Sequence, residues 1–453
     1  MHLEKSPIWA AVRKIFSETQ KPVRFAYTAK IHTTTEDFDV MKIMTIDIIR
    51  DYVNNVGDVV MIEFLMPLGE YVKRFYPNRT NMELTIFRKQ LEEIGDIFKK
   101  NSAKEAERFK VVFLPNENPQ VKGSDLEAYN QETLDHMDVV RVKLQLLNRA
   151  LEPLRIKTTG SIFKNKTNED VIRGLLMGES LNVLIDGKPS VDGIDMVKAD
   201  NQEIQRHIII PQNTLLTSVP SFCQEKMNGV YSTGIGTYLQ SHQGKRYWFV
   251  YPLYNTQRFN ENVKKAIFYV VSSKRFPGVE RTYRESGDTI FITITTDKSY
   301  SDNAETDQMN QGSGFRMADA RAFLKKPIAV AEEGPIGVRN KLNFEVAFKQ
   351  RADNLNFAPL TAKKISSNPF PEFSKISQRN GGRVDLTWNN SNPSMIYPGM
   401  PCKYIYMEGD KMVQKEGVIL FCHTVVQLQG QGVLAKTHAT ASKLTLFVQQ
   451  SNA

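Results

Sequence analysis

The chain has 453 residues, of which 41% are hydrophobic and 24% charged. This balance is typical of a globular protein and excludes a disordered or fibrous chain. The 59 basic and 50 acidic residues leave a formal charge of +9, a modest excess that indicates a solvated surface before it indicates a nucleic-acid partner. Since one core rarely organises a chain of this length, we expect roughly three or four domains.

The amino-terminal sequence and the cysteines indicate where the chain is made. The start, MHLEKSPIWAAVRKIF, has charges close to Met1 and no apolar core of signal-peptide length. Nothing later reaches the roughly 18 consecutive apolar residues of a membrane-spanning helix. Cys223, Cys402 and Cys422 are few, odd in number and far apart, which favours reduced thiols. We therefore expect a soluble protein made in the cytoplasm, without membrane insertion.

The first 115 residues combine one helical arm with a β-rich segment. Residues 7–16 place apolar side chains at helical spacing, and from residue 23 onward the apolar positions alternate with polar ones as in a half-buried strand. Residues 58–66 form an apolar run, and alternation resumes at 82–86. A helix is predicted over 89–100.

The pattern then repeats a similar order of elements. A Pro/Asn/Gly-rich stretch at 115–124 reads as a linker, and residues 140–146 alternate again. Thr167 and Asp170 have nearly the form of a capping box, which predicts a helix behind them. A strand followed by a helix thus occurs twice, and we take internal duplication as a hypothesis.

The second half of the chain reads as many short strands. The middle contains the run RYWFVYPLY at 246–254, while a polar stretch at 295–314 predicts a long exposed loop. Beyond residue 359, about five closely spaced strands indicate a small closed barrel, similar to an oligonucleotide/oligosaccharide-binding fold.

No arrangement of residues predicts catalysis, a metal or a cofactor. Cys422 and His423, with His438 and Cys402 elsewhere, are poor zinc ligands because neighbours on a strand point to opposite faces. His242 is not framed by a nucleophile motif. Two pairs of carboxylates lie in polar stretches where acidic residues are ordinary, namely Asp135 with Asp138 and Asp192 with Asp195. We expect no enzyme, although a cell-wall hydrolase fused to a larger assembly stays open.

A nucleic-acid-binding module is the alternative function. Bases stack on aromatic side chains while cations neutralise phosphates, and residues 245–258 contain both kinds of residue. These are Lys245, Arg246, Tyr247, Trp248, Phe249, Tyr251, Tyr254 and Arg258. A buried strand is the competing interpretation of the same run.

Two segments resemble the baseplate hub proteins of contractile-tailed bacteriophages. Residues 21–86, KPVRFAYTAKIHTTTEDFDVMKIMTIDIIRDYVNNVGDVVMIEFLMPLGEYVKRFYPNRTNMELTI, resemble their opening domain. Residues 396–426, IYPGMPCKYIYMEGDKMVQKEGVILFCHTVV, are similar to the small barrel that such hubs carry.

The resemblance implies a fold that is mainly β with some α. It has tube-like β-barrel domains, each with a helix, and a small C-terminal barrel. The expected domains are an N-terminal helical arm (1–20), a first tube-like domain (21–115), the start of a second one (116–204), a β-rich middle with an inserted loop (205–357) and the C-terminal barrel (358–453).

The implied function is structural. A homotrimer with two similar domains per subunit would form a pseudo-sixfold ring that joins the tail tube to the spike and conducts DNA in transit. The implied partners are therefore the chain itself, the tail tube protein, the spike or central puncturing protein and the surrounding baseplate proteins. The implied location is the tail baseplate of the virion, after assembly in the host cytoplasm.

The alternating segments supply the candidate interface residues. Strand edges completed by sister chains would satisfy backbone groups that an open sheet leaves exposed. The apolar residues of the two clearest alternations are barrel or interface candidates: Val23, Phe25, Tyr27, Val140, Val142 and Leu144.

Overall fold

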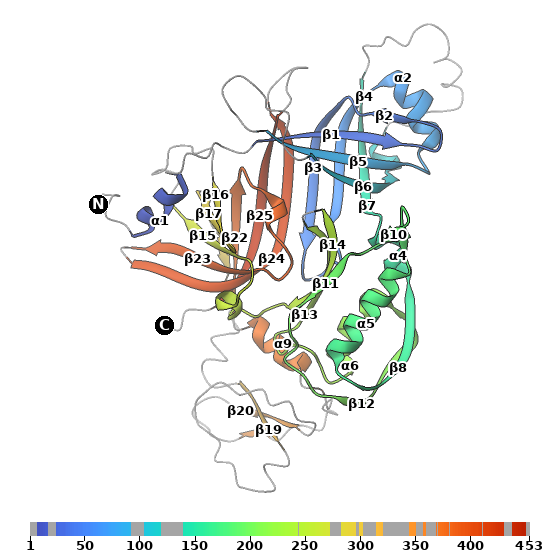
Figure 1. Ribbon diagram of the computed structural model, residues 1–453. Coiled ribbons are helices and arrows are strands. Elements are labelled where there is room, and N and C mark those ends of the chain that lie inside the picture. The colour runs from blue at the N-terminus through green and yellow to red at the C-terminus, as the bar shows by residue number, and fades with distance from the viewer. Residues whose placement is uncertain are drawn as a thin grey trace.

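The computed structural model consists mainly of β-strands with a few helices, which confirms the predicted fold class (Figure 1). It describes residues 7–16, 24–91, 104–118, 139–242, 244–271, 282–295, 299–301, 314–319, 344–349, 357–358, 368, 370–379, 381–409, 411–429 and 437–449. Among the helices in these ranges, none has both the length and the apolar character needed to cross a membrane.

Eight antiparallel strands close into a barrel, called the first barrel below. In spatial order they are β1 (Arg24–His32), β5 (Glu83–Leu91), β6 (Lys104–Phe113), β7 (Val139–Asn148), β4 (Val59–Pro67), β3 (Lys42–Asp51), β24 (Lys411–Gln429) and β25 (Thr437–Gln449). β25 pairs with β24 and also with β1, which returns the order to its start. A short strand, β2 (Asp37–Asp39), pairs with β1, and α2 (Leu68–Glu70) follows β4.

The barrel interior explains the alternation seen in the sequence. Successive side chains of a strand point to opposite faces, so every second residue enters the core. Phe64 of β4 and Leu144 of β7 are fully buried there. Burial of one such side chain contributes about 1.5–3 kcal/mol. The same core includes Phe25, Tyr27, Ala29, Ile31, Ile46, Val60, Ile62, Leu84, Phe109, Val111, Val142, Leu146 and Val426.

His438 closes the seam between β1 and β25. Its Nδ1 accepts the backbone N–H of Tyr27 at 3.4 Å, and its Nε2 lies 3.2 Å from the carbonyl oxygen of Ile43. This pattern requires the tautomer in which Nε2 carries the proton and donates to Ile43. Burial lowers the pKa of His438, so the neutral ring is favoured. His438 is therefore a structural residue of the barrel.

The long hairpin β24–β25 also belongs to a second group of strands. In it, β22 (Gly381–Asn389) pairs with β25, and β23 (Pro401–Glu408) pairs with β24. β15 (Lys265–Val270), β17 (Thr289–Ile294) and β16 (Tyr283–Ser286) continue the sheet beyond β23, and β18 (Ser299–Ser301) pairs with β22. These strands surround a second core that contains Phe268, Ile292, Leu386, Trp388, Tyr404 and Leu446.

Strands near the carboxyl end thus serve both cores. β24 is 19 residues long, and its residues 421–427 pair with β3 of the first barrel while residues 411–418 pair with β23. The sequence analysis places residues 358–453 in a small barrel of their own and residues 139–148 in a second unit, whereas β7 pairs with β4 and β6. Alternation identifies the buried face of a strand but not the strand beside it. The domain boundaries themselves stay a prediction.

A mixed α/β unit covers residues 151–252. Its strands are β8 (Thr158–Lys166), β9 (Leu184–Ile185), β10 (Lys188–Pro189), β11 (Gly193–Met196), β12 (Gln205–Leu215), β13 (Ile235–His242) and β14 (Lys245–Pro252), and its helices are α4 (Leu151–Ile156), α5 (Asn168–Leu181) and α6 (Val219–Lys226). β11, β14 and β13 form one sheet, and β8 and β12 form a two-stranded ribbon. The predicted capping box at Thr167 and Asp170 is present, and α5 follows it.

A close approach at Gly57 joins this unit to the first barrel. Leu239 of β13 donates its backbone N–H to the carbonyl oxygen of Val56 at 2.7 Å. A Cβ on Gly57 would lie 2.4 Å from the side chain of Leu151 and 3.3 Å from the carbonyl oxygen of Leu239. Only glycine leaves room for this contact.

The remaining elements lie around this frame. α1 (Pro7–Phe16) is the helix predicted at the start, and it packs Ile8, Val12 and Ile15 on Tyr269 and Ile405 of the second group. α9 (Phe370–Arg379) precedes β22. β19 (Gly314–Asp319), β20 (Phe344–Lys349) and β21 (Phe357–Ala358) form a separate small sheet.

The helix predicted over 89–100 is wrong where the structure describes it. Residues 89–91 belong to β5, because Lys89 pairs with Ala26 of β1 and with Lys104 of β6. Pairing on both sides outweighs the local helical pattern. Residues 92–100 lie outside the described residues, as does most of the predicted loop at 295–314.

Candidate functional site

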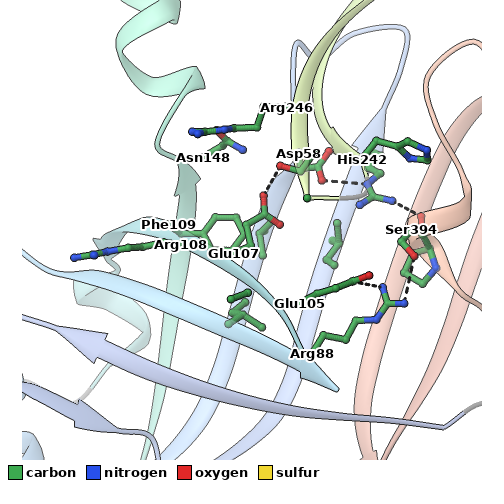
Figure 2. A pocket seen from close by; sticks show the side chains of 18 of the residues that line it. Asp58, Arg88, Glu105, Glu107, Arg108, Phe109, Asn148, His242, Arg246 and Ser394 are labelled. Carbon is green, nitrogen blue, oxygen red and sulfur yellow. Dashed lines mark hydrogen bonds and ion pairs between the residues drawn. The ribbon is translucent and has the colours of Figure 1, made fainter. Parts of the chain in front are cut away.

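One end of the first barrel has a charged interior and holds a cavity of about 500 Å³ (Figure 2). On the strands that supply the apolar core, the inward positions change character toward this end. Arg50 follows Ile46 and Ile48 of β3 by steps of two, and Glu107 precedes Phe109 of β6 in the same way. We call this end the charged mouth.

A buried ion pair lies at the centre of the charged mouth. Arg50 Nε donates to Asp58 Oδ2 at 3.1 Å, and its Nη1 donates to the carbonyl oxygen of Pro393 at 2.7 Å. Asp58 Oδ1 accepts the hydroxyl of Tyr238 at 2.9 Å. Burial opposes the charge of Arg50, but the Asp58 carboxylate and smaller contributions from neighbouring groups together hold the pKa of Arg50 above its ordinary value. The pair thereby connects β3, β13 and the segment before β23.

A second arginine fixes the same segment from another strand. Arg88 Nη2 donates to Asn392 Oδ1 at 2.8 Å and to Ser394 Oγ at 3.2 Å. The Glu105 carboxylate lies 3.6 Å from the guanidinium, whose carbon stands 4.1 Å from the centroid of the Phe25 ring. Figure 2 shows Arg88 and Ser394 turned toward each other. A planar guanidinium suits this combination of stacking and forked donation.

Glu107 faces the hairpin between β13 and β14. It is solvent-accessible, and its Oε1 accepts the hydroxyl of Ser241 at 2.8 Å. Desolvation by the surrounding protein raises the pKa of Glu107, although the Ser241 hydrogen bond opposes this shift. Nearby, His242 lines the cavity, and burial lowers the pKa of its ring.

The arrangement is a clamp, and burial disfavours the reactive thiolate form of all three cysteines. Burial raises the pKa of Cys422, although the charge of Arg50 opposes this shift. Burial also raises the pKa of Cys223 to about 12 and that of Cys402 above its ordinary value. A thiol with a raised pKa is a poor nucleophile. In the described ranges, no three His, Cys, Asp or Glu side chains come together as metal ligands.

The sequence analysis missed the charged mouth. Its charged residues occupy inward positions of strands whose other inward positions are apolar. In the sequence, a charged residue at such a position indicates that the alternating segment has ended. The detectable signal was a change from apolar to charged residues among every second position of one strand, as in Glu105, Glu107, Phe109 and Val111. The partner segments, 238–242 and 392–394, are far away in the sequence and could not be assigned.

The structure places most candidate interface residues in the chain's own core. Phe25, Tyr27, Val142 and Leu144 are buried in the first barrel, and Val140 is half-buried against the same core. Val23 lies outside the described residues. The barrel alternative accounts for these side chains, and a role between subunits stays a prediction.

The aromatic run of the alternative function is buried, which corrects the stacking hypothesis. Trp248 and Val250 of β14 enter the core beneath α5, while Phe249 and Tyr251 enter the second core. Trp248 Nε1 donates to Ser180 Oγ at 2.9 Å, and Tyr254 and Arg258 are also buried. A strand covered on both faces needs apolar residues at every position. Among the aromatic residues of this run, all of which the structure describes, Tyr247 alone is not buried, and it packs half-buried against the second core. Bases therefore lack a row of exposed aromatic faces on which to stack here.

The other residues weighed for chemistry have structural positions. Cys422 is buried, and His423 faces outward with Nε2 3.5 Å from Asp47, as expected for neighbours on one strand. Asp192 Oδ2 accepts the backbone N–H of Arg246 at 2.8 Å. Asp195 lies in β11. Asp135 and Asp138 lie outside the described residues.

Comparison with known proteins finds likeness only among solved structures. No family model and no curated protein matches the chain. Similar structures include a tail protein from Neisseria meningitidis (9% identity, 93% of this chain and 96% of that one, TM-score 0.44) and a 43 kDa tail protein of prophage MuSo2 from Shewanella oneidensis (7%, 93% and 98%, 0.45). The c3393 protein of E. coli, a type VI secretion component described as similar to the T4 tail proteins gp27 and gp5, matches at 9% identity over 93% of this chain and 77% of that one, with a TM-score of 0.41. Two of these proteins are named as tail proteins, and the third is described as a secretion component similar to tail proteins.

Proposed function

We propose that this chain is a structural subunit of a contractile tail, the central baseplate hub that joins the tail tube to the spike. The observation that carries the proposal is where the two hub-like segments meet. Residues 21–86 and 396–426 are separated by more than 300 positions, yet β3 and β24 pair over seven residues, from Phe421 with Asp51 to Gln427 with Thr45. The two segments thus supply adjacent strands of one closed barrel, which β6, β7 and β25 complete.

The role is geometric in this proposal. The charged mouth holds the first barrel, the β13–β14 hairpin and the 392–394 segment in one arrangement through interactions that include two arginines. A subunit that transmits force or joins two symmetries needs such fixed angles between its parts. The hub is a homotrimer in which the subunits form a ring without turnover chemistry, and DNA passes through it in transit.

Assembly of the purified protein tests this function. Light scattering or native mass spectrometry is expected to give a mass of three chains, and electron micrographs are expected to show rings with threefold symmetry. Added tail tube protein and spike protein should bind on opposite faces. A chain that stays monomeric at every concentration, with or without these partners, would refute the proposal. Clearing of a cell-wall substrate in a zymogram would refute the absence of turnover.

A further inference from the structure

The exposed apolar side chains of the described residues gather on one unit. Ten large apolar residues are exposed in the described part of the chain, and seven of them lie between residues 156 and 215, in the mixed α/β unit. They are Ile156, Ile162, Leu181, Leu184, Ile204, Ile209 and Leu215, which are 45–79% exposed. Soluble proteins seldom leave such a group uncovered unless it contacts a partner.

The β8–β12 ribbon presents the centre of this group. Ile162 of β8 and Ile209 of β12 are direct cross-strand partners and both point outward. Their neighbours Ile208 and Ile210 are buried on the opposite face. Neither strand pairs with any further strand within the described residues, so both edges of the ribbon offer free backbone groups. Such an edge is a template for a strand from another chain.

The ribbon is built to keep its outer face accessible. A bulge between Ile210 and Thr214 displaces β12, and a Cβ on Gly160 would lie 2.6 Å from the Cα of Gln212. Asn213 adopts a positive φ of 65°, a conformation that asparagine tolerates. The bulge bends the ribbon without covering Ile162 or Ile209.

The charge of the ribbon defines its partner. β8 and β12 contain the basic residues Lys164, Lys166 and Arg206, together with His207, and no acidic residue. Arg155 and Lys157 precede β8. A complementary surface must combine acidic side chains with exposed apolar ones.

The chain carries such a surface at the end of the first barrel opposite the charged mouth. Asp37 and Asp39 are exposed on β2, whose described residues pair only with β1, and Glu36 precedes them. Within the chain, Asp37 lies 2.9 Å from His32 and 3.5 Å from Lys30, and Glu36 lies 3.3 Å from Arg74. These contacts are at the surface and leave the carboxylates exposed to a second copy. Met41 and Val139, two of the three other exposed large apolar residues, lie at the same end of the barrel. We call Glu36, Asp37, Asp39, Met41 and Val139 the acidic rim. Figure 1 shows β2 and β12 at opposite ends of the molecule.

We propose that the β8–β12 ribbon of one copy receives the acidic rim of a second copy, with β2 aligned along an edge of the ribbon. This inference rests on the proposed hub function and names the surfaces through which its subunits associate. The two surfaces differ, so the contact is heterologous and generates a ring when the rotation closes. Charge complementarity sets the orientation, and the apolar residues lose their contact with water.

Charge exchange tests the contact. The double substitution Lys164→Glu/Lys166→Glu reverses the charge of two residues on the ribbon. The double substitution Asp37→Lys/Asp39→Lys reverses the charge of two residues on the acidic rim. Each pair is expected to weaken self-association at least tenfold in sedimentation velocity over a concentration series at low salt. The chain that carries all four substitutions has exchanged charges and should recover to within threefold of the wild type. Lys226→Glu/Lys411→Glu is the matched control for the ribbon pair, because it lowers the net charge by the same amount at exposed residues outside both surfaces.

The outcomes separate this contact from the hub function. Circular dichroism and the melting temperature identify variants that fold as the wild type does. If folded ribbon and rim variants associate like the wild type, or the four-residue exchange fails to restore association, the contact is refuted while the hub function stands. A wild-type chain that is monomeric at every concentration refutes both. Loss of association in the matched control as well would also refute the specific contact, since it would show dependence on net charge alone.

Discussion

The first barrel and the β8–β12 ribbon have the same alternating pattern and opposite surroundings. In the barrel, every second side chain enters a closed core, and residues such as Phe64 and Leu144 are fully buried. In the ribbon, one apolar set faces α5 while Ile162 and Ile209 face outward. The barrel has no free edge around its eight strands, whereas the described strands leave both ribbon edges unpaired. Closure therefore separates a part whose strand edges are paired within the chain from a part whose edges are suited to association.

The charged mouth shows that the closed first barrel can bury even a charged side chain. Arg50 is 8% exposed, yet each of its described partners is an acceptor in good geometry. Buried charge is tolerated only when it is paired and hydrogen-bonded. The ribbon needs no such compensation, because water reaches its lysines.

The largest effect is expected from breaking the buried pair of the mouth. Arg50→Met leaves Asp58 without its cation and should cost about 3–5 kcal/mol of unfolding free energy. Denaturant unfolding of the variant measures this loss. Arg50→Met/Asp58→Leu removes both charges and should recover a large part of it. A single substitution with an effect below that of an exposed arginine, such as Arg155→Met, would show that the pair does not hold the mouth together.

The second-largest loss of stability is expected from truncating a core side chain in the first barrel. Leu144→Ala leaves a cavity in a fully buried site and should destabilise the chain by about 2–5 kcal/mol. Val139→Ala, on the same strand but exposed at its end, should change stability by less than about 1 kcal/mol. Thermal and denaturant unfolding of both variants measure the difference. Equal effects would contradict the assignment of Leu144 to the closed core.

The raised pKa of Glu107 predicts that the stability contributed by the charged mouth depends on pH. Its pKa is raised on folding, so the folded state holds this proton more tightly and the wild type loses stability as the pH rises through that pKa. Glu107→Gln keeps an acceptor for Ser241 and removes the titration. The variant should unfold at higher denaturant concentration than the wild type at pH 8, and the two should converge near pH 4, about the pKa of an unfolded glutamate. Parallel pH profiles would contradict the raised pKa.

The smallest effect on stability is expected at the ribbon. Ile162→Ser/Ile209→Ser replaces two outward-facing residues and should change the unfolding free energy of the dilute chain by only about 0.5 kcal/mol per site. The same variant should weaken self-association at least tenfold, which sedimentation velocity measures. A stability loss as large as that of Leu144→Ala would show that the ribbon face is covered within the chain.

The sequence by itself determined the class of fold and several local elements. The mainly β architecture follows from apolar residues with a period of two, and α1 and α5 follow from helical spacing and the Thr167 capping box. The opposite orientation of Cys422 and His423 followed from strand geometry alone. These features depend on neighbours a few residues apart, which a sequence displays directly.

Only the tertiary structure decided which strands close on one another and what lies at the mouth. β24 pairs with β3 across nearly 400 residues, and β7 joins the first barrel. Residues 89–91 are drawn into β5 by pairing with β1, and Lys89 also by pairing with β6. Arg50, Asp58 and Glu107 become a site because distant segments supply Pro393, Tyr238 and Ser241. Alternation specifies two faces of a strand, but the free energy of covering either face depends on long-range packing that no local pattern contains.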